Sequence, residues 1–173
     1  MMKIVAVPYD SPEVAALIEG LQSEYVRIYG SRDETPVDAA EFTPPRGTIA
    51  VGYVDDEPVA IGGWRLRDDG QAELKRMYVV EVHRGYGRSR AMLSWLEESA
   101  AAAGVRTMVL ETNQQQPAAL ALYRSAAYQP VPGFGIYTDD PDSVYLGRDL
   151  RPQVPARAMV QSEDEVQQDH SDR

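Results

Sequence analysis

The run RGYGRS at residues 84–89 is the segment of this sequence whose residue types most clearly suggest chemistry. It combines small and basic residues, follows a predicted strand and stands where a predicted helix begins. A helix N-terminus presents backbone N–H groups without intrahelical partners and carries the positive end of the helix dipole. Glycine has no Cβ, so it lets a phosphate group approach the backbone closely. The run, termed the cradle below, therefore predicts a site for a phosphate-bearing ligand.

Two common nucleotide motifs do not explain the cradle. A dinucleotide fingerprint, G-x-G-x-x-G, needs a third glycine, a position early in the chain and an acidic residue about 20 residues further on. Here the third glycine is missing, and the run lies in the middle of the chain after a predicted antiparallel meander. A P-loop needs G-K-S/T, which the sequence lacks.

Length and charge narrow the class of protein further. The 173 residues, 43% hydrophobic and 25% charged, suffice for one domain with a sizeable core. With 17 basic and 27 acidic residues the net charge is −10, which argues against nucleic acid as the main partner. The absence of cysteine excludes disulfides, a thiolate zinc site and a cysteine nucleophile.

Neither a membrane helix nor a secretory signal is predicted. No apolar run approaches the roughly 20 residues that a membrane helix needs, and the opening MMKIVAVPYD lacks the pattern of a signal peptide. We therefore expect a cytoplasmic protein without a membrane partner and without a bound metal ion.

The hydrophobic pattern predicts the elements that position the cradle. Turn residues at 55–58 and 68–70 separate three strands, which predicts the antiparallel meander before the cradle. Helical and strand patterns then alternate, so we expect an α+β protein with one βαβ crossover. The expected elements are strand 3–7, helix 12–29, a short helix at 36–41, strands 48–54, 59–67 and 71–80, helix 87–103, strand 105–112, helix 117–126 and strands 128–131 and 143–149.

These elements predict one domain over residues 1–150. Residues 151–173 show no hydrophobic periodicity and are rich in Gln, Ser, Asp and Glu, which predicts a flexible, polar and acidic tail.

Several segments together resemble the GCN5-related N-acetyltransferase (GNAT) superfamily: ELKRMYV, the cradle with its helix, MVLETN and ALALYRSAAY. The pyrophosphate motif of that superfamily reads Q/R-x-x-G-x-G/A. The chain matches it from Arg84 onward, except that Ser89 replaces the last small residue. The resemblance covers roughly residues 48–150. It implies a GNAT acyl-CoA N-acyltransferase fold, a mixed, mostly antiparallel sheet flanked by helices, with a central pair of strands that splay apart.

The resemblance implies acetyl-CoA as the acyl donor. Backbone groups of the central strand would bind its pantetheine arm, and backbone N–H groups of the cradle would bind its pyrophosphate. Asn113 matches a position that often contacts the arm. The implied cofactor-binding residues are Met77, Tyr78, Val79, Arg84, Gly85, Tyr86, Gly87, Arg88, Ser89 and Asn113.

The resemblance also implies that an amine attacks the thioester directly, without a covalent enzyme intermediate. Tyr123 matches the tyrosine that often protonates the departing thiolate. A carboxylate must accept the proton of the amine, and Glu73 on the central strand is the first candidate. The alternative for Glu73 is a cross-strand ion pair with Lys or Arg. Glu24 and Glu111 are the rival bases.

The acceptor site is the least specified part of the sequence. Glu24, Tyr25 and Trp64 are the candidates for binding the acceptor, with Tyr29 and Phe134 as further wall residues. An aromatic residue on a strand is more often part of the core. His83, next to the cradle, reads as a surface residue.

Three functions fit these observations. The first is acetylation of a primary amine of a small molecule. A homodimer of such an enzyme is compatible with the sequence. The second is a regulatory acyl-CoA-binding module, which needs the cradle but neither an acid nor a base. The third is acetylation of a protein or peptide amine, which a wide groove would favour over a closed pocket.

Overall fold

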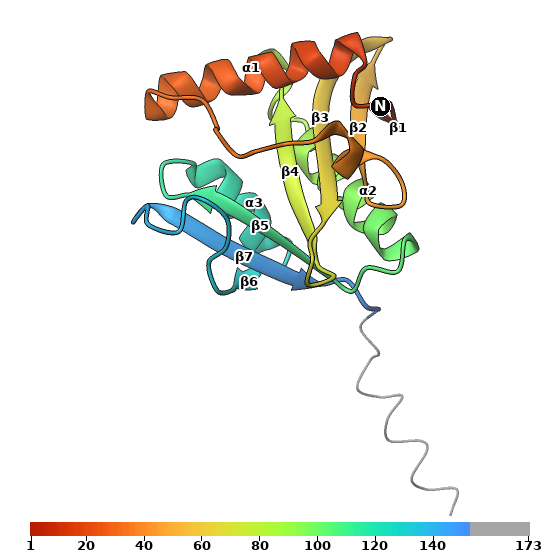
Figure 1. Ribbon diagram of the computed structural model, residues 1–173. Helices are drawn as coiled ribbons and strands as arrows, with labels where there is room; N and C mark the ends of the chain where they lie inside the picture. Colours follow the sequence, from red (N-terminus) through yellow and green to blue (C-terminus); the bar gives the residue numbers. More distant parts are fainter. Residues whose placement is uncertain (153–173) are drawn as a thin grey trace, which may run out of the picture.

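The computed structural model describes residues 1–152, in which seven strands form one sheet of order β1-β2-β3-β4-β5-β7-β6 (Figure 1). From residue 153 on, the predicted tail lies outside the described residues. None of the helices in residues 1–152 has the length and apolar character needed to cross a membrane. The elements are β1 Lys3–Ala6, α1 Pro12–Tyr29, the 3₁₀ helix η1 Ala39–Phe42, β2 Gly47–Val54, β3 Glu57–Leu66, β4 Ala72–Val79, the 3₁₀ helix η2 Glu81–His83, α2 Arg88–Ala102, β5 Thr107–Asn113, α3 Pro117–Ser125, β6 Gln129–Pro130 and β7 Ser143–Asp149.

The predicted α+β order and GNAT-type sheet are confirmed. Strands β1 to β4 pair antiparallel in chain order, and β4 and β5 are parallel neighbours joined through α2. Strand β7 then pairs antiparallel with both β5 and β6. The short helix predicted at 36–41 is instead η1, because the Asp38 side chain caps it by accepting from the backbone N–H of Ala40.

Helix α1 and η1 cover one face of the sheet. Pro12 and Glu13 suit the first turn of α1, and Gly30 ends the helix in the left-handed region with φ 78°. The core on this face is formed by Val14, Leu17, Phe42, Ile49, Val51 and Ile61.

Helix α2 covers the opposite face (Figure 1). Gly62 of β3 makes this close packing possible, because a Cβ there would lie 2.7 Å from Leu96 and 2.9 Å from the sulfur of Met77. The larger core on this face includes Ala60, Trp64, Met92, Leu93, Leu96, Leu120 and Tyr128.

The two halves of the sheet meet at a short seam between β4 and β5. The two parallel strands pair at only two positions among the described residues, Ala72 with Met108 and Glu73 with Val109. Beyond these pairs β4 bends away, because a bulge opposite β3 places Arg76 at φ 63°. The central strand pair therefore splays apart.

Candidate active site

The cradle lies at the N-terminus of α2 and leaves backbone donors available. Gly85 and Gly87 adopt φ 84° and 74°, and a Cβ on either would meet no heavy atom within 4 Å. Gly87 is the N-cap of α2 and provides no side-chain cap, while the first intrahelical bond runs from the Ala91 N–H to the Gly87 carbonyl. The N–H groups of residues 88–90 thus have no intrahelical partner. This geometry fits a diphosphate.

The basic side chains of the cradle are already engaged within the protein. The guanidinium of Arg84 pairs with Glu24 of α1 at 2.8 Å and donates to the Val79 carbonyl at 2.8 Å. Arg88 donates to the His83 carbonyl at 2.8 Å. The backbone of the cradle, more than its side chains, is therefore open to an anion, and a phosphate contact of Arg84 stays a prediction.

The other candidates for cofactor binding lie at this helix start, on β4 and, for Asn113, at the end of β5. Met77 lines a pocket between β4 and β5. The Tyr78 ring packs on Gly20 of α1, where a Cβ would lie 2.9 Å from the phenol oxygen of Tyr78. Tyr86 is 73% exposed, with the Arg88 guanidinium stacked 4.5 Å from its ring centroid. Ser89 is half-buried in the first turn of α2.

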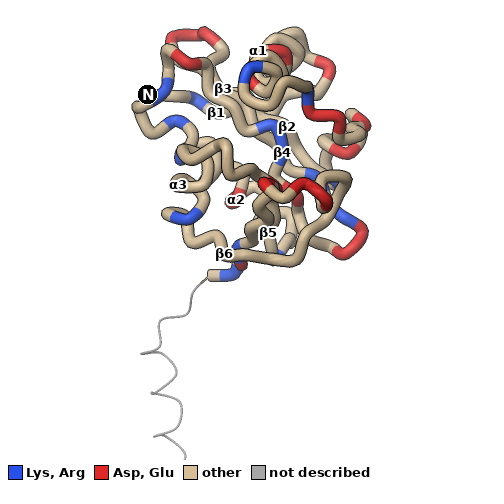
Figure 2. Tube along the Cα trace, turned by 90° about the vertical axis from the view of Figure 1, so that its left-hand side faces the viewer, with Lys and Arg blue, Asp and Glu red and all other residues tan. Residues whose placement is uncertain are grey.

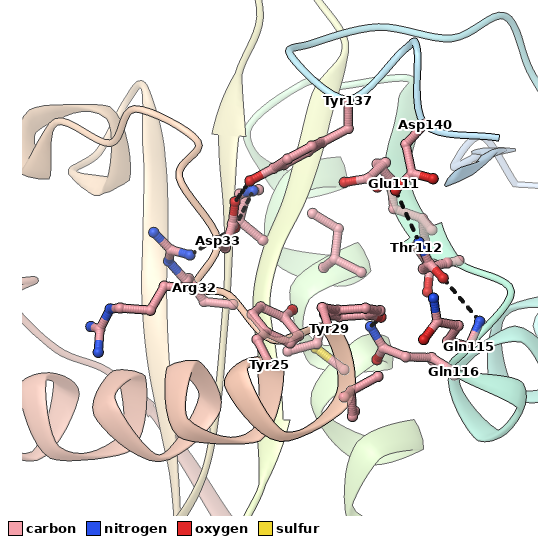
Figure 3. A pocket seen from close by; sticks show the side chains of 18 of the residues that line it. Tyr25, Tyr29, Arg32, Asp33, Glu111, Thr112, Gln115, Gln116, Tyr137 and Asp140 are labelled. Atoms are coloured by element: carbon pink, nitrogen blue, oxygen red, sulfur yellow. Dashed lines mark hydrogen bonds and ion pairs between the residues drawn. The ribbon is translucent and has the colours of Figure 1, made fainter. Parts of the chain in front are cut away.

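A pocket of about 370 Å³ opens where β4 and β5 diverge. The C-terminal end of α1, the loop after it, the start of α3 and the loop between β6 and β7 complete its wall (Figure 3). Its lining residues are Tyr25, Ile28, Tyr29, Ser31, Arg32, Asp33, Leu74, Lys75, Arg76, Met77, Leu110, Glu111, Thr112, Asn113, Gln115, Gln116, Ala119, Tyr123, Tyr137 and Asp140.

Asp33 ties three parts of this wall together. Its carboxylate accepts from Lys75 at 3.2 Å and from Arg76 at 3.0 Å, both on β4. The Tyr137 hydroxyl, from the loop between β6 and β7, donates to it at 3.0 Å and accepts from the Glu34 N–H at 2.7 Å (Figure 3). Two loops far apart in the sequence are thereby bridged beside the pocket.

A second link closes the wall between α1 and α3. The side-chain amide of Gln116 donates to the Tyr29 hydroxyl. Tyr29 is the last residue of α1 and Gln116 is the N-cap of α3, so this bond holds the two helix ends together. Both residues line the pocket.

Two tyrosines, the buried Tyr123 and the half-buried Tyr25, contribute phenol groups to the pocket. Tyr123 is 6% exposed and lines the pocket from α3, and burial raises the pKa of its hydroxyl well above the usual range. Burial likewise raises the pKa of Tyr25, and the nearby Asp33 adds to that shift. Both phenols therefore stay protonated at physiological pH, so each has a proton that it can donate.

Acidic and amide side chains line the end of β5. Glu111 accepts from the Ser143 hydroxyl at 3.0 Å, and burial raises the pKa of its carboxyl above the ordinary value. Asn113 accepts from the backbone N–H of Gln115 at 2.9 Å, and its amide lies 3.5 Å from Asp140. A carboxylate with a raised pKa is a better proton acceptor than an ordinary one.

Three of the predicted site residues lie elsewhere. Glu73 faces a second pocket and pairs with Arg65, its register partner on β3, at 3.2 Å. Trp64 is 2% exposed in the core under α2 and donates to Ser99 at 3.2 Å. Glu24 is held by Arg84 outside the lining of the main pocket.

Conversely, sequence reasoning missed Asp33, Arg76 and Tyr137. Arg76 takes a left-handed φ although it is not glycine, so no turn residue signalled the bulge. The Tyr137–Asp33 bond joins residues 104 positions apart, which no local pattern reports.

Comparisons with known proteins agree with this geometry. The sequence matches the acetyltransferase (GNAT) family over residues 14–128. An IAA acetyltransferase of Azospirillum brasilense is 29% identical over 153 residues, which cover 86% of this chain and 100% of that protein. A structure from Klebsiella pneumoniae subsp. pneumoniae, assigned as an acyl-CoA N-acyltransferase, superposes with a TM-score of 0.76 at 29% identity, covering 87% of this chain and 99% of the other.

A more distant structure shares the fold. A GNAT family acetyltransferase from Elizabethkingia anophelis with acetyl-CoA bound has a TM-score of 0.62 at 14% identity, over 86% of this chain and 97% of its own. The match at residues 14–128 spans more than half of the chain and contains both the cradle and the diverging strands. The chain therefore belongs to the GNAT family of acetyltransferases.

Proposed function

We propose that this protein transfers the acetyl group of acetyl-CoA to a primary amine of a small molecule, by direct attack in a ternary complex. The observation that carries the proposal is the pocket at the seam, which both the buried Tyr123 phenol and the Glu111 carboxylate line. Its volume of about 370 Å³ lies in the range of small-molecule sites. The Asp33–Tyr137 bridge beside it favours a small acceptor over a protein chain.

Acetyl-CoA as donor is supported by the cradle. The N–H groups at the start of α2 and the open space at Gly85 and Gly87 suit its pyrophosphate. After Glu73, β4 no longer pairs with β5, so the backbone groups on that edge of β4 are not used in strand pairing. Those near Met77 can therefore bind the pantetheine arm and the oxyanion that develops on the thioester. The bound donor supplies the acetyl thioester.

We assign the two proton transfers to Glu111 and Tyr123. The amine nitrogen forms a bond to the thioester carbonyl carbon, the carbon–sulfur bond breaks, and the amine proton passes to Glu111, directly or through water. Tyr123 gives its hydroxyl proton to the departing sulfur. Glu111 takes the place of Glu73 in this scheme because it lines the pocket, whereas Glu73 is paired with Arg65.

The proposal is tested by thiol release from acetyl-CoA with a panel of acceptors. The panel contains polyamines, amino acids, aminoglycosides, peptides and IAA, after which the Azospirillum relative is named. Turnover of small amines is expected. Silence across all small amines, or turnover of peptides alone, would overturn the small-acceptor proposal.

Variants test the two assigned roles. Tyr123→Phe and Glu111→Gln should each lower kcat on the order of a hundredfold, because each removes a general acid or base. Tyr128→Phe is the control for Tyr123→Phe, since its ring lies 5.8 Å from Tyr123 but its hydroxyl donates to Glu97 outside the pocket. A larger loss in Glu73→Gln than in Glu111→Gln would return the base role to Glu73.

A further inference from the structure

One side of the pocket, formed by Lys75, Arg76 and Asp33 and called the cationic side below, carries two positive charges and only one negative charge. Lys75 at 3.2 Å and Arg76 at 3.0 Å both donate to the same oxygen, Oδ2, of Asp33. The side chains of all three residues are largely buried, at 11%, 6% and 12% exposed. One negative charge thus faces two positive charges, where water screens them little.

Arg76 also has donors that the protein does not use. Its contact with Asp33 is its one side-chain hydrogen bond within residues 1–152, and its buried Nε has no partner there. Its φ of 63° adds backbone strain, which proteins keep mainly at functional positions. A buried guanidinium with unused N–H groups is costly unless a ligand supplies the acceptors. A carboxylate matches the planar fork of those N–H groups.

Two acids lie at the end of β5, and the charge of Lys75 reaches one of them, Glu111. Neither Glu111 nor Asp140 takes part in an ion pair among the described residues. Figure 3 shows both at the end of β5, across the pocket from Asp33. Glu111 is half-buried, whereas Asp140 is exposed. Two such carboxylates favour the ammonium form of an amine.

From this separation of charge we propose that the acceptor is an amino acid or a similar small molecule that carries both an amino group and a carboxylate. The carboxylate binds Arg76 and Lys75, and the amino group lies at Glu111, which lines the same pocket as Tyr123. The inference rests on the proposed function and adds the class of acceptor. Polyamines lack the carboxylate, so they leave the cationic side unpaired.

The test compares amino acids with their amides, which keep the size and the amino group but lose the negative charge. Lysine, ornithine, phenylalanine and 4-aminobutyrate are assayed beside their amides by thiol release with the full-length protein. We expect at least one acid to exceed its amide in kcat/KM by about tenfold to a hundredfold, the range of one charged hydrogen-bonded contact. Equal turnover of every acid and its amide would overturn the inference and leave the proposed function standing.

The variant Arg76→Gln locates the carboxylate site. It should lower the ratio of kcat/KM for the preferred acid to kcat/KM for its amide by about tenfold or more. Turnover of the amide shows that the variant is folded, and the acid–amide comparison in the wild type needs no variant. Arg46→Gln, at an exposed arginine outside the lining of the pocket, is the control. An unchanged preference in Arg76→Gln, or turnover of polyamines or aminoglycosides without turnover of any acid, would overturn the inference. Silence across all small amines would instead overturn the proposed function itself.

Discussion

At the scale of single residues, Asp33 illustrates how one buried carboxylate positions a site. Besides Lys75, Arg76 and Tyr137, it accepts two hydrogen bonds from Thr35, at 2.9 and 2.7 Å. Burial alone would raise the pKa of Asp33, but the charge of Lys75, the Thr35 bonds and the charge of Arg76 outweigh it. The pKa therefore lies well below the ordinary value of 3.8, and the carboxylate stays ionised.

Asp33→Asn should destabilise the protein by about 3 kcal/mol, because it leaves two buried cations without their counter-charge. Urea unfolding near neutral pH measures this loss. The control is Asp139→Asn, because Asp139 is exposed and lies in the loop between β6 and β7 that holds Tyr137. It should change stability little.

The same variant has a defined pH dependence. The pKa of Asp33 is lower in the folded than in the unfolded protein, so its stabilisation is fully present above 3.8 and is lost as the pH falls through the folded value. The difference in unfolding free energy between wild type and Asp33→Asn should therefore shrink below a pH of about 4. A difference that stays constant down to acidic pH would contradict this account of the Asp33 cluster.

Residue types and motif positions in the sequence predict only some of the residues that line the site. Tyr123, Tyr25 and Asn113 were expected from sequence, and they lie in one pocket. Glu73 was ranked above Glu111, because the sequence did not reveal that the register places Arg65 opposite Glu73. Side-chain partners of this kind depend on pairing between strands, so they could not be assigned from a motif.

At the scale of elements, the cradle owes its shape to two glycines whose backbone other residues rarely adopt. Gly85 and Gly87 have positive φ values, and the space around both is open. An added methyl group would therefore strain the backbone without striking the protein. It would, however, point into the space that a pyrophosphate bound at α2 needs.

Gly87→Ala should weaken CoA binding on the order of tenfold, equal to about 1.4 kcal/mol, as measured by isothermal titration calorimetry. Gly70→Ala is the matched control, because Gly70 has φ 81°, open surroundings and a place in the hairpin between β3 and β4. Both variants should lose about 1 kcal/mol of stability, since both place a Cβ in the left-handed region. Equal CoA affinity in the two variants would argue against a pyrophosphate at the cradle.

Most elements could be predicted because their signals are local. Apolar spacing and Gly30 define α1, and the turn residues around Gly70 separate β3 from β4. The predicted strand at 128–131 is shorter in the structure, where β6 is Gln129–Pro130, since only two residues pair with β7. The bulge at Arg76 was missed, because its cause lies in the register between β3 and β4.

At the scale of the whole molecule, residues 1–152 form one sheet with a core on each face and the candidate site where β4 and β5 diverge. Lys and Arg residues are interspersed with Asp and Glu residues along this part of the chain (Figure 2). We propose that it is the complete catalytic domain, in line with the boundary expected near residue 150.

A protein that ends at Pro152 should therefore keep its thermal unfolding midpoint and its kcat/KM with the best acceptor of the panel. Differential scanning calorimetry and the thiol-release assay measure the two quantities beside the 173-residue protein. A loss of either would show that residues 153–173 contribute to the domain, and the boundary would have to move.

The seam between β4 and β5 has a mechanical consequence. Strands β1 to β4 form one continuous ladder and β5 to β7 another, and two residue pairs at one end of β4 join them. A small rotation of one ladder against the other would widen or narrow the pocket while both ladders keep their own hydrogen bonds. The links Asp33–Tyr137 and Gln116–Tyr29 cross that opening. The two ladders are thus joined by strand pairing at one end of the pocket and by two polar contacts at the other, and both contacts would have to change before the pocket could widen.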